Sequence, residues 1–245
     1  MTVLYEDNHI IAVNKTCNEI VQGDKTGDTP LSETVKAYIK EKYNKPGEVF
    51  LGVTHRLDRP TSGVVLFART SKALTRLNEM FREKSSSLPF REGSGLGPIK
   101  KTYWAIVQGA PKQPEARLEN WLVRNEAQNK SYISTPPKPS PQGRDKDAKL
   151  AVLTYKTLVK GEHYTLLEVN LETGRHHQIR CQLASIGCPI KGDLKYGAKR
   201  SNPDGGICLH ARQIEFIHPV SEQNICITAP VPNDSLWQQF AALVH

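Results

Sequence analysis

The feature that most constrains the fold is a run of five apolar residues, Val64 to Ala68, which directly follows a loop with proline and glycine. A short apolar run bounded by turn residues predicts a buried strand. The preceding loop reads His55-Arg56-Leu57-Asp58-Arg59-Pro60-Thr61-Ser62-Gly63. The two neighbouring arginines favour the charged form of the Asp58 carboxylate. Asp58 is therefore a candidate nucleophile or base, and the alternative is a structural ion pair at a turn.

Three further motifs follow in order. Lys101 to Gly109 reads K-x-Y-x-A-x-V-x-G, Thr173 to Arg180 reads T-G-R-x-H-Q-I-R, and Gly187 to Asp193 reads G-x-P-I-x-G-D. With H-R-L-D-x-x-T-S-G before them, these motifs resemble the RluA-type RNA pseudouridine synthases over nearly the whole chain. Each motif alone is weak, and the combination is highly specific.

The resemblance implies both a fold and an activity. The fold is α+β: a single catalytic domain over residues 1–245, built around a bent, mixed, largely antiparallel β-sheet flanked by helices and loops. No separate N-terminal RNA-binding module is expected, because Asp7 already lies in the catalytic-domain pattern. The activity is site-specific isomerisation of uridine to pseudouridine in structured ribosomal or transfer RNA, with the target base flipped out of the RNA.

Three residues match the family's catalytic positions. Asp58 matches the catalytic aspartate, whose carboxylate can trap or stabilise the sugar cation that forms when a glycosidic bond breaks. Tyr103 matches the tyrosine that lies against the flipped base. Arg180 matches the arginine that pairs with the aspartate, since a guanidinium offers a permanently charged, bidentate partner. The alternatives are a tyrosine packed in a strand and a solvated arginine on a helix.

Four residues are assigned to RNA binding. Arg56 resembles the arginine that fills the space left by the flipped base, and otherwise would be a surface cation. Lys101 contacts an RNA phosphate or packs along its strand. Arg59 and His176 add a guanidinium and an aromatic face, which RNA-binding proteins combine.

The chemistry predicts no cofactor and no metal. Isomerisation changes no oxidation state and needs no group donor. The adjacent residues His176 and His177 do not share a helix face, and no carboxylate stands at helical spacing from them, which disfavours a metal site.

Composition favours an RNA partner and a reducing compartment. The net charge is +8 and the isoelectric point is about 9.2, which favours a polyanionic partner. The five cysteines form no C-x-x-C pair, as is typical of reduced thiols. The N-terminus shows no signal peptide, and no apolar run approaches the ~20 residues of a membrane helix. We expect a cytoplasmic monomer.

The periodicity predicts a mixture of strands and helices. Strands are expected at 3–5, 10–13, 49–53, 64–68, 101–109, 151–158, 164–171, 207–217 and 225–229, and helices from residue 31 and at 71–84, 177–186 and 234–244. Ser71 is the expected cap of the second helix. A loop is expected at 85–98 and a loop or edge excursion at 130–149, because these segments are rich in glycine, serine or proline.

One segment departs from the family pattern. Where the family often has N-K-P-x-G, this chain has Asn14-Lys15-Thr16-Cys17-Asn18. Asn18 tolerates a left-handed backbone better than most residues. The local loop geometry is therefore open.

Two other functions are compatible with the motifs. One is a catalytically silent RNA-binding or ribosome-assembly protein on the same scaffold. The other is a nucleoside hydrolase or glycosylase that uses Asp58 against a glycosidic bond. The joint presence of Asp58, Tyr103 and Arg180 favours the synthase.

Overall fold

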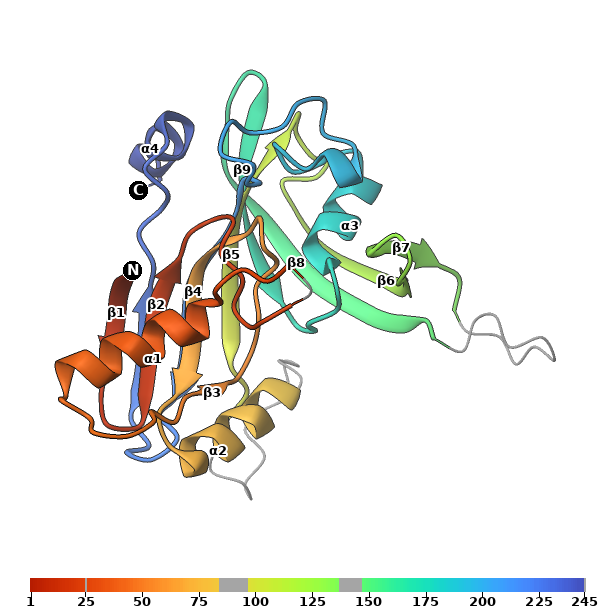
Figure 1. The fold of residues 1–245 in the computed structure, drawn as a ribbon. Coiled ribbons are helices and arrows are strands. Elements are labelled where there is room, and N and C mark those ends of the chain that lie inside the picture. The colour runs from red at the N-terminus through yellow and green to blue at the C-terminus, as the bar shows by residue number, and fades with distance from the viewer. Residues whose placement is uncertain (25, 84–96, 137–146, 245) are drawn as a thin grey trace. The chain divides into compact units, whose positions relative to one another are not determined.

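The computed structural model describes residues 1–24, 26–83, 97–136 and 147–244, which form two compact units. The first unit contains Met1–Lys101 and His210–Asn233, and the second contains Thr102–Leu209 and Asp234–His245. Each unit has its own strands and helices (Figure 1).

In the first unit, neighbouring strands pair in the order β1, β2, β4, β10 and β11, and β3 pairs with the end of β4. The strands are β1 (Thr2–Glu6), β2 (Ile10–Lys15), β3 (Gly52–Val53), β4 (Ser62–Ala68), β10 (Leu209–Ile217) and β11 (Asn224–Thr228). The pairing of β4 with β10 is parallel and aligns Ser62 with His210, whereas the others are antiparallel. The sheet is therefore mixed.

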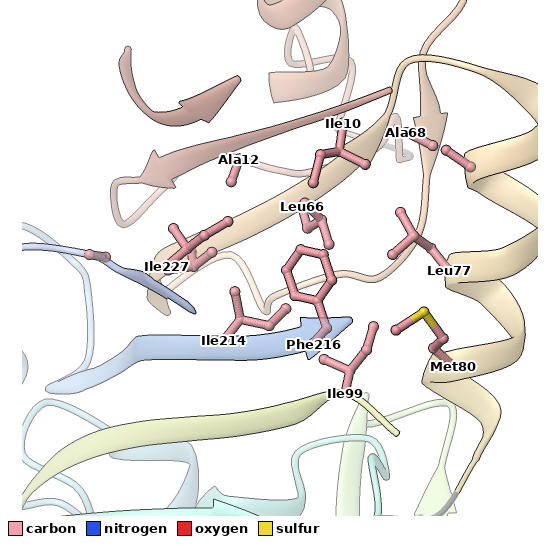
Figure 2. Close-up of a cluster of buried hydrophobic side chains, with 13 residues drawn as sticks. Ile10, Ala12, Leu66, Ala68, Leu77, Met80, Ile99, Ile214, Phe216 and Ile227 are labelled. Carbon is pink, nitrogen blue, oxygen red and sulfur yellow. The ribbon is translucent and has the colours of Figure 1, made fainter. Parts of the chain in front are cut away.

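β4 is the buried strand that the apolar run predicts, because all of its residues are buried. Successive side chains of a strand point to opposite faces, so alternate residues meet the same neighbour. On one face Leu66 packs with Phe216 of β10 and with Leu77 and Met80 of helix α2 (Ser71–Arg82), as Figure 2 shows. Each such buried side chain contributes ~1.5–3 kcal/mol to stability.

Hydrogen bonds to one carboxylate, that of Glu6, link helix α1 (Leu31–Lys42) to β1. The side chain of Glu6 is only 7% exposed and accepts hydrogen bonds from Tyr38, Lys42 and Tyr43. These bonds lower the pKa of Glu6, although burial opposes them. The helix thus holds the strand hairpin that carries Lys15.

In the second unit, the strands pair in the order β5, β9, β8, β6 and β7, and all these pairs are antiparallel. The strands are β5 (Lys100–Gln108), β6 (Glu115–Asn125), β7 (Lys130–Ser134), β8 (Lys149–Lys160) and β9 (Tyr164–Leu171). β7 stands at the end of this row.

Three helical elements complete the second unit. They are α3 (Gln178–Ser185), the 3-10 helix η1 (Leu194–Tyr196) and α4 (Ser235–Ala242). Helix α3 lies beside β6 and β7 (Figure 1). A small core joins α3 and η1 to the strands through Leu122, Ala151, Cys181 and Tyr196.

Most predicted elements are confirmed, as is the α+β class with a mixed, largely antiparallel sheet. The helix cap is a correction: Thr70, and not Ser71, accepts a hydrogen bond from the backbone of Ala73. The segment 130–149, expected as a loop or edge excursion, is a strand at both ends: β7 is the last strand of the sheet order, in agreement with an edge position, and β8 begins at Lys149. Strand β6 was not predicted. Residue 84, the expected end of the second helix, and residues 85–96 and 137–146, within the two predicted loops, lie outside the described residues.

Candidate active site

The loop that carries Asp58 closes around the buried ammonium group of Lys15. Lys15 ends β2 and is completely buried. Its Nζ donates hydrogen bonds to the carbonyl oxygens of Asp58, Arg59 and Thr61, at 3.3, 2.9 and 2.6 Å, and to that of Thr16 at 3.0 Å. Burial lowers the pKa of Lys15 to about 8. One cation thus fixes the backbone of the candidate catalytic residue.

The segment that departs from the family pattern also holds this loop. Asn18 has a left-handed backbone with φ 71°, and its N–H donates to the carbonyl oxygen of Arg59 at 3.0 Å. Asparagine adopts this conformation at lower cost than most residues. The loop therefore keeps a defined geometry without the glycine.

His55 is a structural residue of the loop. Its Nε2 accepts a hydrogen bond from the backbone N–H of Leu66 at 3.0 Å, and its ring stacks on Phe81 at 4.7 Å. Burial lowers the pKa of His55 to about 3. The imidazole is therefore neutral at physiological pH and ties the loop to β4.

The two arginines beside Asp58 have different surroundings. Arg56 is exposed and makes no hydrogen bond or ion pair with any residue that the structure describes. Arg59 lies 2.6 Å from Asp28 and 3.6 Å from Asp24. These contacts raise the pKa of Arg59, chiefly through the hydrogen bond with Asp28. Arg59 thus ties the Asp58 loop to the segment before α1.

The end of the loop is shaped for the parallel strand pair. Gly63 has φ 116°, and a Cβ atom there would lie 2.3 Å from the backbone oxygen of Ala211. Next to it, the Ser62 hydroxyl lies 2.9 Å from Nδ1 of His210. The lack of a side chain at Gly63 thus permits the close approach of β4 and β10.

Lys101 and Tyr103 lie on β5. The Lys101 ammonium lies 5.8 Å from the ring centre of Phe81, and burial lowers its pKa. Tyr103 is 9% exposed and opposite Val169 of β9. A tyrosine with a partly covered ring is compatible both with strand packing and with a contact to a flipped base.

Arg180 is held on three sides within the second unit. Its Nε and Nη2 donate to the two carboxylate oxygens of Asp193 at 2.7 and 2.8 Å, and its Nη1 donates to Nε2 of His177 at 2.9 Å. The ring of Tyr196 lies 5.1 Å from the guanidinium carbon. Both partners of the ion pair are buried. Bidentate, charge-assisted bonds of this kind fix the guanidinium in one orientation.

His177 is the residue at which the chain turns into α3. It has a left-handed backbone, with φ 51°, and precedes the helix directly. Because Arg180 can only donate, His177 accepts at Nε2 and carries its proton on Nδ1, 3.0 Å from the Tyr196 hydroxyl. Burial lowers the pKa of His177 to about 2. The ring is therefore neutral.

Other residues of the T-G-R-x-H-Q-I-R motif make hydrogen bonds and ring contacts that stabilise this turn. The Gln178 amide oxygen accepts from the Thr173 hydroxyl and from the backbone N–H of Arg175. His176 stacks on His177 at 3.8 Å, and its Nδ1 lies 2.9 Å from the Ser131 hydroxyl. Much of the motif thus positions the residue at its end, Arg180.

The predicted site residues divide between the two units. Arg56, Asp58, Arg59 and Lys101 lie in the first unit, and Tyr103, His176 and Arg180 lie in the second. The pairing of Arg180 with Asp58 therefore stays a prediction. Sequence reasoning missed Lys15 and Asp193, although both stand inside quoted motifs.

In the described chain, no helix is long and apolar enough to cross a membrane. Among the same residues, no three histidine, cysteine or acidic side chains gather where a metal ion could bind.

Comparison with known proteins agrees with the motifs and the fold. The family model described as RNA pseudouridylate synthase matches residues 9–185. The structure resembles a human protein titled RNA Pseudouridylate Synthase Domain Containing 4, with a TM-score of 0.76 at 22% sequence identity over 99% of this chain and 92% of that one.

Curated relatives match most of the chain. The uncharacterized RNA pseudouridine synthase YhcT of Bacillus subtilis is 30% identical over 96% of this chain and 70% of its own length. The ribosomal large subunit pseudouridine synthase D of Xanthomonas campestris is 31% identical over 96% of this chain and 67% of its own. The chain thus spans about two thirds of these relatives' lengths.

The fold and the motifs define an RNA-modifying isomerase. The chain belongs to the RNA pseudouridylate synthase family, and its activity is the conversion of uridine to pseudouridine in RNA.

Proposed function

We propose that this enzyme isomerises a uridine of large-subunit ribosomal RNA and acts as a cytoplasmic monomer. The observation that carries this proposal is the H-R-L-D-x-x-T-S-G loop, in which Lys15 fixes the backbone at Asp58. The choice of RNA is supported by relatives named ribosomal large subunit pseudouridine synthases C and D. The positive net charge suits a phosphate-rich substrate.

In the proposed reaction, the C1′–N1 bond of uridine breaks and a C1′–C5 bond forms after the uracil turns. The proton on C5 leaves and N1 gains one, so atoms and electrons balance without a cofactor. Asp58 stabilises or traps the positive charge that develops at C1′, or removes the C5 proton. A carboxylate fixed in position acts without the cost of reorganisation.

The other assigned residues act around this carboxylate. Arg180 pairs with Asp58 and orients its carboxylate. Tyr103 lies against the extruded uracil, and Arg56 takes the space that the base leaves in the RNA. Arg59, Lys101 and His176 contribute RNA contacts, so that the predicted site draws on one catalytic domain spanning residues 1–245.

The test is incubation of the purified protein with uracil-labelled transcripts of large-subunit ribosomal RNA and, separately, of transfer RNAs. Pseudouridine in the ribosomal transcript supports the proposal, and mapping gives the position. Pseudouridine only in transfer RNA overturns the choice of substrate. Free uracil would indicate a glycosylase, and binding without product would indicate a silent RNA-binding protein.

A further inference from the structure

The tip of the β6–β7 hairpin gathers three cations, which we call the tip cluster: Arg124, Lys130 and Lys195. Arg124 donates to the side-chain oxygen of Asn129 at 3.3 Å, in the turn between the strands. Lys195, from η1, reaches the same turn and donates to the carbonyl oxygens of Gln128 and Asn129 at 3.3 and 3.1 Å. Lys130 begins β7 and lies 5.1 Å from the ring centre of Tyr196.

None of these three cations forms an ion pair with a carboxylate in the part of the chain that the structure describes, although Glu126 lies in the same turn. Other cations differ: Arg69 pairs with Glu6, and Arg117 with Glu172. The tip cluster instead uses carbonyl and amide oxygens and aromatic rings. Like charges near one another repel each other, and a bound anion reduces this repulsion.

The tip cluster lies next to Arg180 through a short chain of contacts within the second unit. The ring of His176 lies 3.1 Å from Asn129 and stacks on His177, which binds Arg180. Arg124 and Lys195 are close enough to add, after burial, to the lowering of the pKa of His177. An anion at the tip would therefore be a neighbour of the nucleotide at the predicted site.

An exposed aromatic ring accompanies the charges. Tyr132 of β7 is 38% exposed, and the Lys130 ammonium lies 5.2 Å from its ring centre. Surfaces that bind RNA strands combine cations for phosphates with aromatic rings for bases.

We propose that the tip cluster binds the phosphate backbone of the substrate RNA beside the target uridine. This inference rests on the proposed function, because it takes the bound anion to be the strand that contains the target. It adds to the site a surface on β6, β7 and η1 that none of the sequence motifs in the first unit provides.

The test compares two double variants with equal loss of charge. Arg124→Ala with Lys195→Ala removes two exposed cations of the tip cluster. The control, Lys156→Ala with Lys160→Ala, removes two exposed cations of β8, where Lys156 lies opposite Glu115 at the other end of β6. Binding of a fluorescein-labelled, uridine-containing RNA hairpin is measured by anisotropy over a series of KCl concentrations.

We expect the tip variant to raise Kd about tenfold and to reduce the slope of log K against log salt by about 1–2. The control should change neither. Equal Kd and equal slope for the two variants would overturn the inference. Lys130→Ala should reproduce the effect, so that a misfolded double variant, detected by its melting temperature, leaves a second test.

The two proposals fail in different ways. Anisotropy requires no turnover, so a tip effect in a protein that makes no pseudouridine would refute only the proposed function. A wild-type enzyme that makes pseudouridine, with a tip variant that binds RNA like the control, would refute only the tip surface.

Discussion

Arg180 is fixed more firmly than one ion pair would fix it. Asp193 binds it on two nitrogens and His177 on a third. Lysine has a single nitrogen on a flexible chain and cannot satisfy both partners in this geometry. An arginine at this position therefore provides a guanidinium of fixed orientation as well as a positive charge.

At Asp193, removal of the charge should damage both stability and turnover. Asp193→Asn leaves a buried guanidinium without its counter-charge, which typically costs ~3–5 kcal/mol. Urea unfolding should show this loss, and kcat should fall while RNA affinity stays. The matched control is Glu172→Gln, which breaks the exposed pair with Arg117 and should change unfolding little. Equal effects of the two variants would contradict the bracing role of Asp193.

At Asp58, removal of the charge should abolish turnover without weakening RNA binding. Asp58→Asn keeps the side-chain shape but cannot act as nucleophile or base. Phosphate contacts carry most of the affinity, so Kd should change less than about threefold. Pseudouridine formation and anisotropy measure the two quantities on one preparation. Near-normal turnover would exclude Asp58 from the chemistry.

At the scale of elements, the sequence predicts what depends on local pattern. The spacing of Leu77 and Met80 predicts the buried face of α2, and the apolar run predicts β4. Thr70 and Ser71 are both residue types that commonly cap helices, so the sequence does not distinguish them. The cap is the last residue with an extended backbone before the helix, and in the structure this residue is Thr70. Strand β6 was missed although polar and apolar residues alternate from Glu115 to Glu119, because Asn120 and the apolar run Trp121 to Val123 break the period; its partners β7 and β8 supply the pairing.

Long-range contacts at the site could not be predicted in the same way. Three of the four carbonyl oxygens around Lys15 belong to residues more than 40 positions away, and every residue has a carbonyl, so no side-chain pattern marks this cage. Asp193 stands 13 residues after Arg180, beyond helical spacing, and the turn after α3 brings them together. The candidate residues could be named from sequence, whereas their supports required the fold.

Gly63 gives a prediction for the parallel pair of β4 and β10. In Gly63→Ala the new methyl group meets the backbone of Ala211, which cannot move aside as a flexible side chain would. The control is Gly109→Ala, where φ is 70° but nothing lies within 4 Å of the added Cβ. We expect a loss of ~1–2 kcal/mol for the control, from backbone strain alone. Gly63→Ala should lose about 4 kcal/mol or more in urea unfolding.

Equal losses for the two glycine variants would mean that the strands can separate without cost. The close approach would then have no role in the fold.

For the whole molecule, three neutral histidines set the response to acid. Burial lowers the pKa of His55, His177 and His210 to about 3, 2 and 4. In the unfolded chain a histidine takes up its proton near pH 6.5, so the unfolded state binds more protons between that pH and the native pKa values. The contribution of these histidines to the free energy of unfolding should therefore be level above about pH 6.5 and fall below it.

The expected slope below pH 6 is up to ~1.4 kcal/mol per pH unit for each of these histidines. Urea unfolding at pH 7.5, 6.0 and 5.0 measures it. His163 is 77% exposed, so His163→Gln should leave the slope unchanged and serves as the control. A free energy that stays constant down to pH 5 would show that the three rings can be protonated without loss of structure.

The cage of Lys15 has a consequence for chemical labelling. An amine that is enclosed by carbonyl oxygens and fully shielded from solvent cannot reach an acylating reagent while the loop is shut. In the native enzyme the other, exposed lysines should react first, and acylation of Lys15 should follow the rate at which the loop opens. Peptide mapping of acylated Lys15 at successive times, with and without RNA, would measure the rate at which the Asp58 loop opens.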